Sequence, residues 1–169
     1  MEKTLRVLNG MVKDGVIEEY AIGGAVAAIF YVEPINTNDL DVFFDIGSGG
    51  LGLAALAPLY DYLSGLGYKP HGETVDIEDW PVQFLPVFNL LVEEAVERAK
   101  RIKFKRTPTR VMTAEHLVAI MLQTGRLKDY ARIQQFLEHR VLDRKRLADI
   151  LKRHALDKKW KIFEQEYLR

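Results

Sequence analysis

The stretch that most constrains the fold of this chain is residues 20–46, which read YAIGGAVAAIFYVEPINTNDLDVFFDI. An apolar run meets two glycines, an apolar helix-like segment follows, and Asp39 opens a second strand-like run. Side chains alternate between the two faces of a strand, so Asp39 and Asp41 should point the same way, roughly 6–7 Å apart at the backbone. The apolar side chains should face the opposite side: Leu40, Val42 and Phe44. Two carboxylates on one face of an apolar strand are costly unless a cation or solvent compensates them.

Length and composition predict one domain, or one domain with a small appendage. Of the 169 residues, 48% are apolar, which is enough for a hydrophobic core. The chain has no cysteine, which excludes disulfides, thiolate metal sites and cysteine nucleophiles. No apolar run approaches the roughly 20 residues of a membrane span, and residues 1–20 lack the apolar region of a signal peptide. We therefore expect a cytoplasmic protein with no membrane contact.

The spacing of apolar residues, glycines and prolines predicts helices that alternate with strands, followed by helices alone. Helices are expected over 2–14, 24–31, 52–66 and 90–100, the second ended by Glu33-Pro34 and the third kinked at Pro58. Strands are expected over 18–22, 39–46, 68–78 and 81–86, with a flexible turn at 47–50 and an extended segment over 102–112. From Thr113, an expected N-cap, helices continue to residue 124 and then cover 126–138, 143–154 and 157–168.

This order of elements predicts an α+β fold, close to α/β, in which helices flank a mixed β-sheet. Residues 1–112 should form the core of the fold. Residues 113–169 should form a C-terminal helical segment that packs on that core.

Formal charge is divided unevenly along the chain. Residues 1–97 carry 4 Lys and Arg against 16 Asp and Glu, a net charge of −12, whereas residues 98–169 carry 20 against 8, a net charge of +12. Such asymmetry indicates a polyanionic partner or two halves that attract each other; the alternative is a set of basic helices with solvated faces. One stretch concentrates the positive charge: Arg98, Lys100, Arg101, Lys103, Lys105, Arg106 and Arg110. It would suit a nucleic-acid backbone such as tRNA, or it is an edge strand that its lysines protect from aggregation.

Two blocks of residues resemble the nucleotidyltransferase superfamily, which shares the fold of DNA polymerase beta. In the first block, a Gly-Gly pair and an Asp-x-Asp at the start of a strand match Gly23, Gly24, Thr37, Asp39 and Asp41. The second block, EHLVAIMLQTGRLKDYARI, looks like a helix pair of small bacterial nucleotidyltransferase-like proteins, including abortive-infection and type IV toxin–antitoxin transferases. Its matching positions are Glu115, Leu117, Gly125, Arg126, Lys128, Asp129 and Ile133. The resemblance spans roughly residues 18–137 and implies a nucleotidyltransferase-like core.

The resemblance also implies a mechanism. Asp39 and Asp41 would be the catalytic pair and would hold Mg²⁺ or Mn²⁺, a cation that prefers oxygen ligands and bridges substrate phosphates. Gly23 and Gly24, with Thr37, would bind a nucleoside triphosphate, because free N–H groups at a helix start favour anions. The alternatives are a tight turn without a ligand for the glycines and a solvated strand end for the aspartates.

Arg126, Lys128 and Asp129 form a second candidate site for the nucleotide. The two cations would contact the triphosphate or the acceptor, and Asp129 would orient them through a charge-assisted hydrogen bond. The alternative is a helix N-terminus with local salt bridges, each of which contributes little to stability.

The sequence departs from active members of the superfamily at two positions. Val82-Gln83-Phe84-Leu85 looks like the third core strand, and Gln83 stands where active members carry a third carboxylate; a glutamine is a poor proton acceptor and carries no negative charge. Asp45 shares the face of Asp39 and Asp41 but should lie too deep, so Asp76 or Glu78 on the neighbouring strand could substitute. Met121 stands where the related toxins often have a lysine, so a triphosphate would lose one counter-charge there.

These features support three hypotheses. The first is a Mg²⁺-dependent nucleotidyltransferase that transfers a nucleoside monophosphate from an NTP to a hydroxyl of a small molecule, a protein or tRNA. The second is a catalytically inactive protein of the same fold that binds nucleotide, nucleic acid or a partner protein. The third is a nucleic-acid-binding module built on the basic C-terminal half. The base, the acceptor and the oligomeric state stay open at this point.

Overall fold

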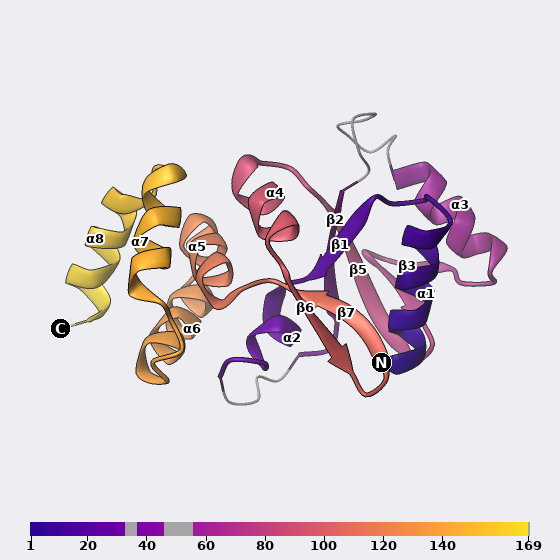
Figure 1. The fold of residues 1–169 in the computed structure, drawn as a ribbon, viewed down its shortest axis with the longest axis horizontal. Coiled ribbons are helices and arrows are strands. Elements are labelled where there is room, and N and C mark those ends of the chain that lie inside the picture. The colour runs from indigo at the N-terminus through magenta and orange to yellow at the C-terminus, as the bar shows by residue number, and fades with distance from the viewer. Residues whose placement is uncertain (33–36, 46–55, 169) are drawn as a thin grey trace.

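The computed structural model describes residues 1–32, 37–45 and 56–168. These residues form eight helices and a seven-stranded sheet of order β3-β4-β5-β2-β1-β7-β6 (Figure 1). The strands are β1 (Glu19–Ile22), β2 (Leu40–Asp45), β3 (Pro70–His71), β4 (Thr74–Ile77), β5 (Trp80–Pro86), β6 (Lys100–Phe104) and β7 (Thr107–Val111). The helices are α1 (Glu2–Lys13), α2 (Gly24–Ala28), α3 (Ala57–Gly65), α4 (Leu90–Glu97), α5 (Ala114–Thr124), α6 (Leu127–Glu138), α7 (Arg144–Arg153) and α8 (Asp157–Tyr167). The predicted α+β class is confirmed, with its mixed sheet and C-terminal helical segment.

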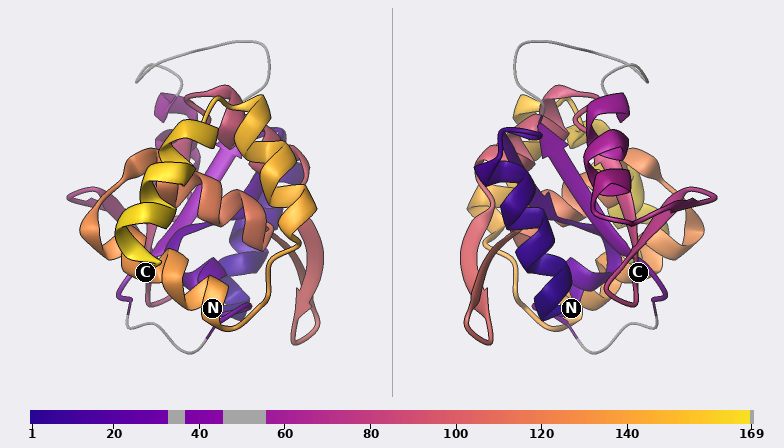
Figure 2. Two further views of the ribbon diagram at one scale, coloured as in Figure 1. Left: turned by 90° about the vertical axis from the view of Figure 1, so that its left-hand side faces the viewer. Right: turned by 90° about the vertical axis from the view of Figure 1, so that its right-hand side faces the viewer.

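Helices cover both faces of the sheet. α1 and α3 lie on one side, and α2, α4 and the C-terminal helices lie on the other (Figures 1 and 2). The amphipathic sequence of α1 explains its position, because its apolar residues Leu5, Leu8 and Met11 are fully buried while its charged residues face solvent. The sheet is therefore the middle layer, and strands at its centre are buried on both faces.

The central strands place the polar residues of the candidate site. β2 runs antiparallel to β1 and parallel to β5, and the register of the parallel pair sets Asp41 beside Gln83. Leu40, Val42 and Phe44 are fully buried, which agrees with the alternation predicted for this strand. Asp41 and Gln83 therefore share one face of the sheet, the face opposite these three apolar side chains.

α5 joins the C-terminal helices to the rest of the fold. It packs against α2 and α4 on one side and against α6 and α7 on the other, while α8 lies on α6 and α7. Its predicted N-cap is confirmed, because the Thr113 hydroxyl accepts a hydrogen bond from the backbone N–H of His116 at 3.3 Å. Gly125 adopts a left-handed φ of 73° and ends the helix.

One carboxylate, that of Glu94 in α4, ties this helix to both α5 and α7. It accepts hydrogen bonds from the guanidinium of Arg153, from His154 Nε2 at 2.7 Å and from His116 Nε2 at 3.4 Å. Burial disfavours the charged form of this side chain, which is only 13% exposed. The hydrogen bonds from Arg153 and His154 outweigh that effect and lower the pKa of Glu94 to about 2.

Several predicted element boundaries were wrong, each for a local reason. The expected kink at Pro58 is absent because α3 begins at Ala57, and a proline in the first helical turn breaks no hydrogen bond. Residues 68–78 form two short antiparallel strands, since Gly72 turns the chain with a φ of 65°. The extended segment 102–112 is a hairpin that turns at Lys105, where φ is 54°. The predicted break at Glu33-Pro34, the turn at 47–50 and the start of helix 52–66 lie outside the described residues.

Candidate active site

The two glycines after β1 are required by the side chains of β2. Gly24 has a φ of 55°, and a Cβ at this residue would lie 1.7 Å from Asp41 Oδ2. A Cβ at Gly23 would lie 2.5 Å from the ring of Phe43. The backbone is fixed as well, because the Gly23 N–H donates to the carbonyl of Asp41 at 3.0 Å. The Asp41 carboxylate therefore lies directly against the start of α2, and the glycines allow this close approach.

Asp39 precedes β2 and is oriented by its neighbour Thr37. The Thr37 hydroxyl donates to Asp39 Oδ1 at 3.0 Å and lies 3.3 Å from the Asp39 carbonyl oxygen. Asp39 and Asp41 flank the buried Leu40 and line the same cavity, as the alternation of side chains predicts. The structure therefore brings the carboxylate pair and the predicted threonine together.

The electrostatics of Asp41 show that it lacks a direct counter-charge. Burial is the main reason why the pKa of Asp41 rises from its ordinary value of 3.8 to about 6, and the charge of Asp39 adds to the rise. Three cations of the α6 region, Arg132, Arg126 and Lys128, lower it only in part. A partly buried carboxylate beside a second carboxylate is the environment that a bound divalent cation would relieve.

The predicted cations lie at the start of α6. The Arg126 guanidinium binds Asp129 through Nε at 2.8 Å and Nη2 at 3.3 Å, and the Arg126 backbone N–H donates to the same carboxylate at 3.3 Å. The Asp129 side chain is only 1% exposed, so this carboxylate caps α6 and orients Arg126. Lys128 has an exposed side chain, and no ion pair with the described residues holds it.

These residues surround one cavity of about 570 Å³ between the sheet and the C-terminal helices. Nearly all the predicted site residues line it; Gly23 does not, although its neighbour Gly24 does. Ten of its lining residues are polar or charged: Thr37, Asn38, Asp39, Asp41, Gln83, Thr124, Arg126, Lys128, Asp129 and Arg132. The others are mainly apolar: Gly24, Ala25, Phe43, Leu85, Phe88, Met112, Leu117, Ile120 and Met121. Its size and its mixed lining suit a ligand with one polyanionic and one flat apolar part.

Sequence reasoning missed several residues that line this cavity, among them Arg132 and Phe88. Arg132 follows Lys128 by one helical turn, so both reach the cavity from the same face of α6. That spacing was the available signal, but an arginine on an amphipathic helix usually indicates only a solvated face. Phe88 is 62% exposed at the end of β5, and a large exposed aromatic ring beside a cavity could have been read as a contact surface.

The proposed substitutes for the missing third carboxylate lie away from the cavity. Glu78 accepts a hydrogen bond from the Tyr68 hydroxyl at 2.7 Å and pairs with Lys3. Asp76 is exposed, with its carboxylate 3.9 Å from His71 Nδ1. Neither residue lines the cavity, nor does Asp45 at the far end of β2. Among the described residues, no group of three or more His, Asp or Glu side chains is arranged to hold a metal ion, so the carboxylate pair stands as a pair.

The basic stretch forms the β6–β7 hairpin, and β6 is an edge strand of the sheet. Arg110 does not belong to an exposed cationic face, because its guanidinium binds Glu19 and donates to the carbonyls of Val96 and Glu97. The cations at the edge remain exposed: Lys100, Arg101, Lys103, Lys105 and Arg106. This is the sheet position that the alternative interpretation, protection of an edge strand, requires.

Comparisons with known proteins identify the fold. No family model matches the chain, and no curated protein matches it significantly. The crystal structure of an antigenic nucleotidyltransferase-like protein from Paracoccidioides brasiliensis has a TM-score of 0.55 and 12% identity, and it covers 94% of this chain and 92% of that chain. The chain has a nucleotidyltransferase-like fold. A second structure with this fold, ANT(2″)-Ia in complex with adenylyl-2″-tobramycin, has a TM-score of 0.53 and 12% identity over 95% of this chain and 99% of that chain.

Within the described residues, none of the helices is long enough and apolar enough to cross a bilayer.

Proposed function

We propose that this protein is a Mg²⁺-dependent nucleotidyltransferase that transfers a nucleoside monophosphate from an NTP to a hydroxyl acceptor. One observation carries the proposal: Asp39 and Asp41 line the same cavity as the cations of α6 within a nucleotidyltransferase-like fold. Paired carboxylates and nearby cations suit phosphoryl-group chemistry, because positioning and charge neutralisation supply most of its rate.

The donor set fits a hard divalent cation. Asp39 and Asp41 supply carboxylate oxygens, and the raised pKa of Asp41 reflects a negative charge without a direct partner. Mg²⁺ or Mn²⁺ held there would neutralise the negative charge that develops on the phosphates of the donor. Thr37 would keep the Asp39 carboxylate in place through its hydrogen bond.

The residues of the cavity offer contacts to both parts of the donor nucleotide. Lys128 and Arg132 offer cationic side chains for the phosphates, and Arg132 supplies the charge that Met121 lacks. Arg126 is already bound to Asp129 and contributes a fixed positive charge. The exposed ring of Phe88 offers a flat apolar surface for the base.

The acceptor that we propose is a molecule with a free hydroxyl group. ANT(2″)-Ia was crystallised with adenylyl-2″-tobramycin, and we infer that a hydroxyl-bearing small molecule, a protein or tRNA accepts the nucleotidyl group here. A toxin–antitoxin or abortive-infection role, and action in the cytoplasm, rest on the sequence alone. Growth arrest on expression of the wild type, lost in Asp41→Asn, would support the toxin role.

The second candidate function is a non-catalytic protein of this fold that binds nucleotide, nucleic acid or a partner protein. Gln83 favours it, because the register places this amide beside Asp41, where a third carboxylate would be expected. The two functions differ in turnover, whereas both allow nucleotide binding.

A thermal melt tests the proposed function first. The wild type and Asp41→Asn are melted with each of the four NTPs, with and without Mg²⁺ or Mn²⁺. A ligand that binds only the folded state raises the melting temperature, so we expect a metal-dependent rise for at least one NTP in the wild type alone. No rise with any NTP would refute the proposal. A rise without turnover on any acceptor would favour the non-catalytic protein.

A further inference from the structure

Gln83 lies where the resemblance to active nucleotidyltransferases implies a third carboxylate. It is the register partner of Asp41 on the neighbouring parallel strand, and its half-buried side chain lines the cavity. Its amide carries no charge and accepts no proton at ordinary pH. The acceptor hydroxyl must nevertheless lose a proton during transfer, so the cavity needs a base that Gln83 does not provide.

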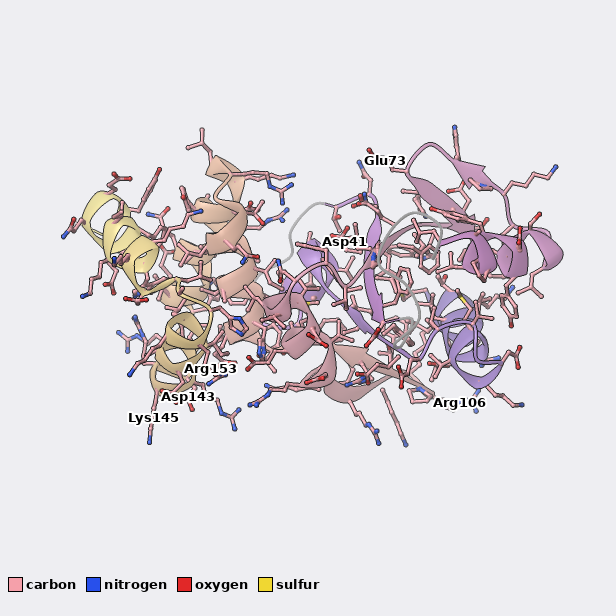
Figure 3. The ribbon with its side chains drawn as sticks, turned by 90° about the horizontal axis from the view of Figure 1, so that it is seen from above. Asp41, Glu73, Arg106, Asp143, Lys145 and Arg153 are labelled. Carbon is pink, nitrogen blue, oxygen red and sulfur yellow. The ribbon has the colours of Figure 1, made fainter. Side chains whose placement is uncertain are left out.

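A carboxylate reaches this amide from the adjacent hairpin. Gln83 Nε2 donates to Glu73 Oε2 at 3.4 Å. Glu73 lies in the turn between β3 and β4, and β4 pairs antiparallel with β5, the strand of Gln83. The distance is at the long end of the hydrogen-bond range. Seen from above, Glu73 and Asp41 lie on the same side of the molecule, and Arg106 lies on the other (Figure 3).

The partners of the neighbouring acidic residues single out Glu73. Glu78 is held by Tyr68 and Lys3, and Asp76 lies beside His71. Glu73 is not itself among the residues that line the cavity, but it contacts Gln83, which is. Within the described part of the chain, Glu73 is the carboxylate with a hydrogen bond to Gln83, and its exposed side chain has no ion pair that would neutralise it.

We propose that Glu73, oriented by the Gln83 amide, is the general base of the transfer; this proposal rests on the proposed function. The acceptor O–H bond breaks and its proton passes to the Glu73 carboxylate. The acceptor oxygen forms a bond to the α-phosphorus of the NTP. The bond from that phosphorus to the bridging oxygen breaks, and its electron pair leaves with pyrophosphate. The acid that is absent from β5 is thus supplied by the turn of a different hairpin.

The test separates base catalysis from nucleotide binding. Glu73→Gln, the matched control Asp76→Asn and the wild type are compared for turnover and for the Mg²⁺-NTP rise in melting temperature. Asp76 is a suitable control because it is an exposed acid of the same hairpin that lies beside His71 and has no hydrogen bond to Gln83. General-base catalysis contributes at least about 100-fold, so we expect Glu73→Gln to lose that much turnover while it keeps the rise. The control should keep both properties.

A rescue variant adds a readout that a merely structural role would not move. Gln83→Glu places a carboxylate in the position beside Asp41, so it should restore turnover in the Glu73→Gln background. Wild-type-like turnover of Glu73→Gln, an equal loss in Asp76→Asn, loss of the melting-temperature rise in Glu73→Gln, or a failure of the rescue would each overturn the role of Glu73. By contrast, a wild type without any rise and without turnover refutes the proposed function itself, and the role of Glu73 falls with it.

Discussion

Replacing Asp41 by asparagine should stabilise the metal-free protein, although the same change should abolish its metal-dependent binding of NTP. The expectation follows from the raised pKa of Asp41, which burial and the charge of Asp39 bring to about 6. The folded state therefore binds this proton more tightly than the unfolded state, whose carboxyl has the ordinary pKa of 3.8. Between these two values the folded protein holds more protons, so its stability falls as the pH rises.

The magnitude can be worked from the two pKa values. Each pH unit between them corresponds to about 1.4 kcal/mol, so ionised Asp41 lowers the free energy of unfolding by up to about 3 kcal/mol once the pH exceeds about 6. Asparagine has nearly the same shape and cannot ionise. We therefore expect Asp41→Asn to be more stable than the wild type by up to about 3 kcal/mol at pH 8, and of nearly equal stability below pH 3.8.

Urea unfolding with a chelator present measures this difference across the pH range. Asp61→Asn, an exposed carboxylate on α3, serves as the control and should change stability little at any pH. With Mg²⁺ and NTP added, the order should reverse, since only the wild type gains stability from binding. An Asp41→Asn variant that is no more stable than the wild type at pH 8 without metal would refute the electrostatic reasoning about this site.

Three further changes test other parts of the site and fold. Gly24→Ala should destabilise the protein by more than Gly15→Ala in chemical unfolding and should remove the NTP-dependent rise in melting temperature. Both glycines have positive φ, but only Gly24 faces Asp41, so equal losses of stability in the two variants would contradict this. Arg132→Met should weaken the NTP-dependent rise, and an unchanged NTP titration would speak against its phosphate contact. Glu94→Gln should lower the free energy of unfolding by up to about 3 kcal/mol above pH 4.5, because the pKa of Glu94 is lowered to about 2. In a urea series, the greater stability of the wild type should disappear as the pH falls from 4.5 towards 2, and a pH-independent difference would contradict this reasoning.

The sequence predicted the parts of the site that lie within one element or one turn. Alternation along a strand places Asp39 and Asp41 together, and two glycines before a helix mark a close approach of two backbones or side chains. The cap at Thr113 is equally local, because the hydroxyl and the N–H that it accepts from are three residues apart. These features follow from the geometry of a single segment.

The parts that the sequence did not predict depend on the register between segments. Arg110 appears as one more cation of a basic stretch until β7 is paired with β1, which brings its guanidinium to Glu19. Glu73 is ten residues from Gln83, and only the antiparallel pairing of β4 and β5 brings the two together. The turn at Lys105 was missed because lysine and arginine are not turn-forming residues, and the left-handed φ there is imposed by the hairpin.

The hydrogen bonds of Glu94 bear on how this fold can be recombined. Its carboxylate lies in a helix of the first two thirds of the chain, whereas two of its hydrogen-bond donors, Arg153 and His154, belong to the last third. A chimera that received foreign helices after residue 112 would leave this nearly buried glutamate with Arg98 but without those two donors, and removing the partners of a buried charge is destabilising. A single acid in α4 thus decides which C-terminal segments this core can accept, and shuffling of the two parts will succeed only where the incoming segment brings its own cation to that position.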